Sequence, residues 1–174
     1  GVTKRLGLDH QSLKEVNPKI ITCSISGFGD TEVNRPAYDN LIQGYAGAMS
    51  ITGSDKENPV KSGIPIADLG AGLYAVIGIL SAIQSREKND FGEHVDISML
   101  DTQVSLLTYM ATMHFLSGEN PEPIGNQHMN HVPFNSYKTS DGFIQIGVVA
   151  EDFWPSLIEA LDLRQLDTEE NKVR

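Results

Sequence analysis

Apolar residues recur every three or four positions between residues 69 and 87, a spacing that predicts a long helix. The large members of this pattern are Leu69, Leu73, Val76, Ile77, Leu80 and Ile83. A second side carries the small residues Ala71, Ala75, Gly78 and Ala82, which suit close helix packing. The apolar part is too short for a membrane span, so a buried helix is expected and no membrane partner.

The rest of the chain alternates between helix and strand patterns up to about residue 116. Shorter helices are expected at 9–16, 38–50, 101–116 and 151–161, and strands at 19–26, 94–98 and 143–149. The first of these strands is rich in isoleucine, which is typical of a strand buried on both faces of a parallel sheet. The sequence therefore predicts an α/β fold, with a large domain at 1–116, a linker at 117–133 and the start of a smaller domain at 134–174.

Composition narrows the classes of function. The chain has 174 residues, of which 40% are hydrophobic and 21% charged, as in a soluble globular protein. A formal net charge of −10 argues against nucleic-acid binding, although local cations can still hold an anionic ligand. Cys23 is the single cysteine, so an intrachain disulfide is impossible and a thiolate metal site is not expected. Its apolar strand predicts a buried thiol and favours a reducing, cytoplasmic compartment.

One carboxylate, Asp68, stands in an otherwise uncharged run from Ser62 to Ser85. It lies at the expected start of the long helix, where an aspartate can cap free N–H groups and meets the positive end of the helix dipole. Gly70 and Gly72 keep the first turn bare, so a ligand can approach the backbone. From this local pattern alone, an ordinary N-cap is the favoured interpretation.

His128 and His131 are three residues apart, but no carboxylate or thiolate cluster accompanies them, so no metal site is predicted.

The first five residues do not look like an initiator sequence or a targeting signal, which predicts a fragment of a longer protein.

Six segments, taken in order, resemble the family III CoA-transferases, a group that includes formyl-CoA transferase, carnitine CoA-transferases and α-methylacyl-CoA racemases. They are GVTKRLGL at 1–8, NPKIITCSISGFG at 17–29, RPAYDNLIQGYAG at 35–47, the segment 63–72 with its helix, GEHVDISMLD at 92–101 and GNQHMNHVPF at 125–134. The resemblance implies a Rossmann-like large domain, a small α+β domain and two chains interlocked as a homodimer. Full-length members are much longer, so this fragment is expected to be inactive by itself.

The resemblance implies that Asp68 is a covalent nucleophile. In the family, the aspartate at this position attacks an acyl-CoA thioester, forms a mixed anhydride and then an aspartyl-CoA thioester, and passes CoA to a carboxylic acid. CoA esters are therefore expected as substrates, with no permanently bound cofactor. A carboxylate is ionised at neutral pH and needs no general base, and neighbouring backbone N–H groups could stabilise an oxyanion.

Tyr38 separates two activities within the family. Related racemases carry a histidine in a Gly-His-Asp segment as an acid/base partner, whereas this chain reads Ala37-Tyr38-Asp39. A tyrosine, with an unperturbed pKa of about 10, is a poor base at neutral pH. Transferases of the family have tyrosine here, beside the CoA, with a tyrosine that only packs against its neighbours as the alternative. The residue favours a transferase; a racemase and a noncatalytic α/β binding fragment remain the alternatives.

Other positions carry weaker implications from the resemblance. Arg5 matches an arginine that contacts CoA phosphates, with a solvated surface arginine as the alternative. Met99 matches a position lining the CoA site, with a core methionine as the alternative. Arg35 and Lys61 are possible helpers. His128 fits a loop near the substrate opening, with an exposed loop histidine as the alternative. The glycine-only loop of formyl-CoA transferase is not visible, which argues against a formyl-CoA substrate.

Overall fold

The computed structural model describes residues 2–33 and 35–168, and the chain divides into two compact units. The first comprises residues 1–52 and 59–121, and the second comprises 53–58 and 122–174. The loop 53–58 joins the second unit because the Gly125 N–H donates to the Gly53 carbonyl (2.7 Å) and Lys56 pairs with Glu122 (3.2 Å). The sequence did not indicate that this loop belongs with the later residues.

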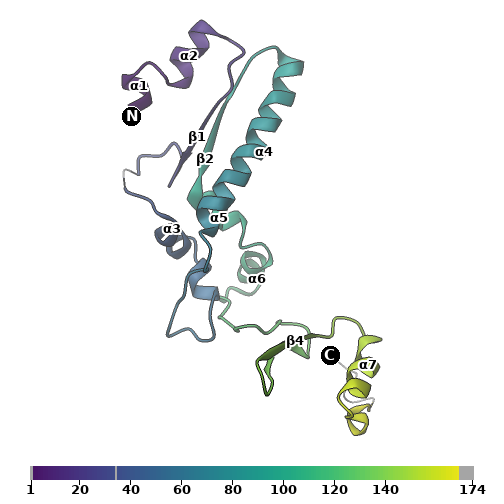
Figure 1. Cartoon of the computed structure of the whole chain (residues 1–174). Helices are drawn as coiled ribbons and strands as arrows, with labels where there is room; N and C mark the ends of the chain where they lie inside the picture. The colour runs from purple at the N-terminus through teal and green to yellow at the C-terminus, as the bar shows by residue number, and fades with distance from the viewer. Residues whose placement is uncertain (1, 34, 169–174) are drawn as a thin grey trace. The chain divides into compact units, whose positions relative to one another are not determined.

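The first unit contains a parallel pair of strands and most of the helices (Figure 1). Its elements are α1 (Val2–Arg5), α2 (His10–Val16), β1 (Thr22–Ser26), α3 (Asp39–Tyr45), η1 (Ala48–Ile51), α4 (Ile66–Asn89), β2 (His94–Ser98), α5 (Met99–Ser105) and α6 (Tyr109–Ser117). β1 pairs with β2 in parallel, with Thr22 opposite His94 and Ser26 opposite Ser98. Parallel strands need a crossover connection, and α4 lies in that connection, running alongside both strands.

The second unit is an antiparallel hairpin followed by a helix. β3 (Phe134–Lys138) pairs with β4 (Phe143–Gly147), and α7 (Phe153–Ala160) and η2 (Arg164–Leu166) follow. The second strand was predicted, but β3 was not, because its polar residues Asn135, Ser136 and Lys138 hide the strand pattern. A mixed α/β fold is confirmed; the complete Rossmann-like domain stays a prediction.

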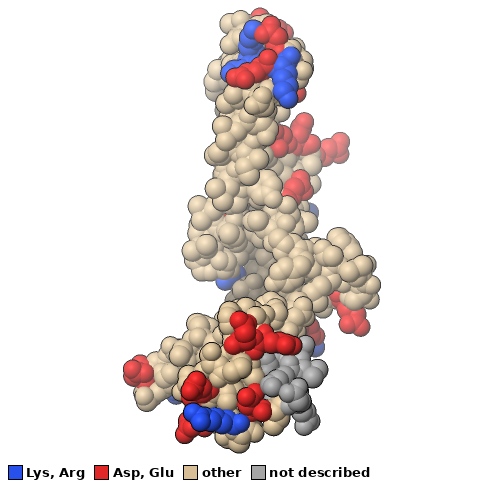
Figure 2. Space-filling view, turned by 90° about the vertical axis from the view of Figure 1, so that its right-hand side faces the viewer, with Lys and Arg blue, Asp and Glu red and all other residues tan. Residues whose placement is uncertain are grey.

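The small-residue side of α4 is its packed side, and the large apolar side is exposed. Ala67, Gly70, Ala71, Ala75 and Ala82 are buried. Leu69, Leu73, Val76, Ile77 and Leu80 are each more than half exposed, and Figure 2 shows this side as a surface without charges below a charged end. The prediction of a helix is confirmed, but the expectation that its large apolar residues are buried is wrong for the described chain.

The helix is also longer than its sequence pattern indicated. With 24 residues, α4 is long and apolar enough to cross a membrane by length and composition, so the prediction of a segment too short for a membrane span is wrong. The small-residue side of α4 packs against β1, β2, α3 and α5. This packing favours a helix inside the protein over a helix that spans a membrane.

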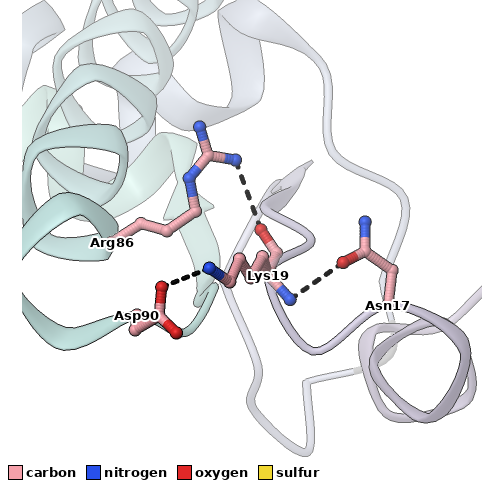
Figure 3. Close-up of polar contacts among 4 residues, drawn as sticks. All are labelled: Asn17, Lys19, Arg86 and Asp90. Atoms are coloured by element: carbon pink, nitrogen blue, oxygen red, sulfur yellow. Dashed lines mark hydrogen bonds and ion pairs between the residues drawn. The ribbon is translucent and has the colours of Figure 1, made fainter.

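The core of the first unit lies where the start of α4 meets α3 and α5. Ile42, Ala67 and Ala71 are fully buried, Met99 joins them, and Phe28, Ala37, Ile97 and Leu100 pack around this cluster. At the other end of α4, Arg86 Nη1 donates to the Lys19 carbonyl (3.3 Å) and Lys19 pairs with Asp90 (Figure 3). Both ends of the helix are therefore joined to neighbouring segments of the unit.

Three further sequence predictions need correction. Cys23 is exposed, because β1 has a strand neighbour on one side only among the described residues, and its pKa is raised by partial burial and by Asp96. The helix expected at 38–50 is α3 followed by the short η1. The helix expected at 101–116 breaks at Thr108, whose φ of 51° lies in the left-handed region, so that α5 and α6 are separate.

The closeness of α4 to β2 generates a stability prediction. A Cβ on Gly78 would lie 2.6 Å from Val95 Cγ1, whereas a Cβ on Gly72 would meet nothing within 4 Å. Both substitutions by alanine gain similar helix propensity, but overpacking adds a cost of about 1–3 kcal/mol at Gly78 alone. Denaturant unfolding of the intact protein should therefore find Gly78→Ala less stable than Gly72→Ala by that amount. Equal stabilities would contradict the packing described here.

Candidate active site

Asp68 lies in the first turn of α4, and its side chain is exposed. It is the third residue of the helix; the N-cap position belongs to Pro65, which makes no side-chain capping bond. The N-cap interpretation of Asp68 is therefore wrong. Among residues 2–33 and 35–168, the carboxylate of Asp68 has no hydrogen-bond or ion-pair partner. It remains an accessible anion at the positive end of a long helix.

The capping carboxylate comes from Asp39, the first residue of α3. Asp39 Oδ1 accepts hydrogen bonds from the backbone N–H groups of Ala67 (2.9 Å) and Asp68 (3.4 Å). The first N–H groups of any helix lack partners within the helix, so an acceptor here stabilises its first turn. This role was not predicted from the sequence, because the two partners are 28 and 29 residues away from Asp39.

Gln43 extends this arrangement into the loop before α4. Its side chain is 1% exposed, and its Nε2 donates to Asp39 Oδ2 (2.6 Å). Its Oε1 accepts from the Ser62 N–H (2.8 Å). Asp39 and Gln43 therefore hold both the approach to α4 and its first turn. A polar pair at positions i and i+4 of the short α3 is the sequence signal that could have indicated them.

The backbone N–H groups around Asp68 already donate hydrogen bonds to other acceptors. The Ile66 N–H donates to the Ile64 carbonyl (2.8 Å) and the Leu69 N–H to the Pro65 carbonyl (3.0 Å). With Ala67 and Asp68 bound to Asp39, the N–H groups of residues 66–69 all have partners. The suggestion that these groups stabilise an oxyanion does not fit this geometry, because a donor already satisfied is not preorganised for a reacting atom.

Tyr38 lies beside this arrangement. It occupies the N-cap position of α3 in an extended conformation (φ −133°, ψ 154°), and its side chain is 67% exposed. Its chain neighbour Asp39 contacts the backbone of Asp68, so Tyr38 and Asp68 lie on adjoining first turns. The structure therefore brings these two predicted site residues into one region of the first unit.

Met99 lies in the core beside the start of α4, whereas Arg5 lies away from it. Met99 is 8% exposed and packs in the core cluster with Ala67, which supports the core interpretation that the sequence left open. Arg5 ends α1, is exposed, and makes no side-chain hydrogen bond or ion pair with the described residues. Figure 1 shows α1 next to α2, away from the start of α4.

The two possible helper cations lie around α3. Arg35 Nη1 donates to the Tyr45 hydroxyl (3.2 Å), and Lys61 Nζ donates to the Ser62 carbonyl (3.1 Å). Lys61 and Tyr45 line an open hollow of about 560 Å³ together with Asn40, Leu41, Gly44 and Met49. Because Ser62 also binds Gln43, this hollow adjoins the segment that leads to Asp68.

The histidine pair lies in the second unit. The rings of His128 and His131 are 4.5 Å apart, and His128 also contacts Phe134 at 5.2 Å. Across the part of the chain that the structure describes, no group of three or more His, Cys, Asp or Glu side chains is placed to hold a metal ion.

Comparisons with known proteins place this arrangement in a family. The chain is 38% identical over 146 residues to a succinate–glutarate CoA-transferase of Agrobacterium fabrum, covering 83% of this chain and 36% of that protein. It is 33% identical over 175 residues to a succinyl-CoA:mesaconate CoA-transferase of Haloarcula marismortui, covering 97% and 44%. The chain thus spans less than half the length of these curated relatives.

Its fold is also similar to that of a solved protein. The crystal structure of a CAIB/BAIF family protein from Brucella suis superimposes with a TM-score of 0.86 at 36% identity, covering 97% of this chain and 46% of that one. The sequence profile described as "CoA-transferase family III" matches residues 1–173. The chain therefore belongs to CoA-transferase family III.

Proposed function

We propose that the intact protein transfers CoA from an acyl-CoA thioester to a carboxylic acid, with Asp68 as the covalent nucleophile. The observation that carries this proposal is the exposed, unpaired carboxylate of Asp68 in the first turn of α4, in a chain of this family. A carboxylate that capped its own helix would engage its lone pairs with N–H groups. Asp39 takes that task, which leaves the Asp68 carboxylate free to attack.

The proposed reaction has four steps. An Asp68 carboxylate oxygen attacks the thioester carbonyl carbon, the C–S bond breaks, and CoA thiolate leaves behind a mixed anhydride. The thiolate attacks the aspartyl carbonyl and expels the donor carboxylate, which forms an aspartyl-CoA thioester. The acceptor carboxylate attacks the same carbon and releases the thiolate again. The thiolate then attacks the acceptor's acyl carbon and releases the free Asp68 carboxylate with the new CoA ester.

We infer dicarboxylates as the substrate class. The relatives' names specify succinate, glutarate and mesaconate, which share two carboxylates on a short carbon chain. Succinyl-CoA is therefore the first donor to test. The cations Lys61 and Arg35 support this class, because they lie around α3, Lys61 in the segment that leads to Asp68 and Arg35 at Tyr45, and can attract an anionic group.

Tyr38 favours transfer over racemisation. A racemase needs a base near the α-carbon of the acyl group, and no histidine stands at this position. The exposed phenol of Tyr38 instead offers an apolar ring and a hydroxyl beside the region of Asp68.

A homodimer is part of the proposal. The homodimer is supported by the large apolar side chains of α4, which are more than half exposed. A contiguous apolar surface of this kind is typical of an interface between chains. A second chain wrapped around the first, as in the interlocked dimer that the resemblance implies, would cover that side of the helix.

Substitution of Asp68 tests the nucleophile. Asp68→Asn retains the shape but removes the attacking charge, so turnover with succinyl-CoA and glutarate should be lost in the intact protein, and mass spectrometry should find no hydroxylamine-sensitive acyl or CoA adduct at residue 68. The wild-type protein should show that adduct. Asp101→Asn is the matched control, since Asp101 is also exposed and is also the third residue of a helix, α5.

Near-normal turnover of Asp68→Asn, in a sample checked for deamidation, would contradict the proposal. An active wild-type enzyme that forms no adduct would contradict it equally, because a racemase and a noncatalytic binding fragment trap none.

Arg5 is proposed to bind a CoA phosphate. A charge-assisted hydrogen bond to phosphate contributes roughly 1.5–3 kcal/mol, so Arg5→Ala should raise the KM for CoA esters about tenfold or more with little change in kcat. Lys4→Ala is the control, because Lys4 is the neighbouring exposed cation of α1. An equal KM for Arg5→Ala and wild type would remove Arg5 from the site, and an equal rise in both variants would indicate only a general loss of positive charge.

A further inference from the structure

The start of α4 poses a problem that its own residues do not solve. A helix of 24 residues begins at Ile66 with no capping side chain at Pro65, although its first N–H groups lack acceptors within the helix. The acidic residue in the first turn, Asp68, accepts no hydrogen bond from the described residues. An aspartate that is both a nucleophile and a helix cap would have its lone pairs engaged, so the two tasks compete.

Asp39 resolves this competition. Its Oδ1 accepts from the N–H of Ala67 and from the N–H of Asp68 itself, at 2.9 and 3.4 Å. The second of these bonds holds the backbone of the same residue whose carboxylate reacts. Any shift of Asp39 therefore changes where the Cα of Asp68 lies and how its side chain is directed.

Gln43 fixes Asp39 in turn. The amide of this nearly fully buried residue donates to Asp39 Oδ2 at 2.6 Å and accepts from the Ser62 N–H at 2.8 Å. Ile42, next to Gln43 in α3, packs against Ala67 and Ala71 in the core cluster. The polar contacts and the apolar contacts between α3 and α4 therefore fix the same turn of the helix.

We propose that Asp39, held by Gln43, is a positioning residue for the transfer reaction: it caps α4 in place of Asp68 and sets the position from which the Asp68 carboxylate attacks. This inference rests on the proposed function of Asp68 as the nucleophile. It assigns Asp39 no contact with the reacting atoms. The polarity of the pair is specific, because both carboxylate oxygens of Asp39 face donors and the two ends of the Gln43 amide face an acceptor and a donor.

This arrangement can be tested by exchanging the carboxylate and the amide between positions 39 and 43. In Asp39→Asn, one side-chain atom becomes a donor that faces the donor Nε2 of Gln43. In Gln43→Glu, a carboxylate faces the carboxylate of Asp39. The double variant Asp39→Asn/Gln43→Glu restores every bond. Its amide at position 39 accepts from the N–H groups of α4 and donates to the new carboxylate at position 43, which also accepts from the Ser62 N–H. The total charge of the pair is unchanged.

The expected result is a split between kcat and KM in the intact protein. Because small displacements of reacting groups cost up to about a hundredfold in rate, each single variant should lower kcat by about tenfold or more. The KM for the CoA ester should stay within about twofold, and adduct formation at Asp68 should slow in parallel with kcat. The double variant should recover most of the wild-type kcat.

Asp9→Ala is the matched control for loss of a helix cap. Asp9 caps α2 through the N–H (3.3 Å) and the hydroxyl (2.7 Å) of Ser12, and α2 lies away from the start of α4 (Figure 1). A cap with a merely structural role lowers the melting temperature and leaves kcat unchanged when the assay is run well below that temperature. Asp9→Ala should behave in this way.

Two results would overturn the proposal: single variants that keep the wild-type kcat, or a double variant no faster than the slower single variant. If the single variants do not fold, the double variant alone decides, since it must fold and turn over at close to the wild-type rate. The test of Asp39 as a positioning residue can be distinguished from the test of Asp68 as the nucleophile. An active Asp68→Asn enzyme refutes the function of Asp68, whereas an inactive Asp68→Asn enzyme with normal Asp39→Asn and Gln43→Glu variants refutes only the positioning role.

Discussion

The first turn of α4 must have its backbone N–H groups satisfied, and the carboxylate of Asp39 does this from another helix. The bonds to the N–H groups of Ala67 and Asp68 join α3 to α4 at one point. The fully buried Ile42, Ala67 and Ala71 pack at the same point, so hydrogen bonding and apolar burial reinforce one another. The location of Asp68 on the surface of the first unit follows from this junction.

The two sides of α4 serve different neighbours. Its alanines and glycines allow β2 and α5 to come close: a Cβ added at Gly78 would lie 2.6 Å from Val95, and one added at Gly70 would lie 3.1 Å from Thr102. Its large apolar residues face outward in this chain. A helix with two apolar sides needs two covering layers, and the described residues of the first unit supply one. This constraint links the fold of the chain to the proposed dimer.

How far the sequence predicted the structure depends on the range of each interaction. The strand at 94–98 was predicted at its observed bounds, and the helix α4 was predicted from the spacing of its apolar residues. Both predictions succeeded because these patterns are local in the sequence. The small-residue side of α4 was predicted to pack closely and does so, but its period does not identify the strands and helices that it packs against. The break at Thr108 carries no glycine or proline signal. Asp68 was located by its isolation, but its cap depends on a residue 29 positions earlier, so the sequence assigned the cap to the wrong carboxylate.

The central claim is that Asp68 loses one carboxylate oxygen to the donor acid and takes one from the acceptor acid in each turnover. In the proposed route the attacking acceptor oxygen bridges the second anhydride and stays on Asp68 when CoA leaves with the acceptor acyl group. Single turnover with ¹⁸O-labelled glutarate should therefore put one heavy oxygen into the tryptic peptide of residues 62–86. Asp68 is the only carboxylate side chain in that peptide, so mass spectrometry assigns the label without ambiguity. Complete turnover with no label in this peptide would contradict the account.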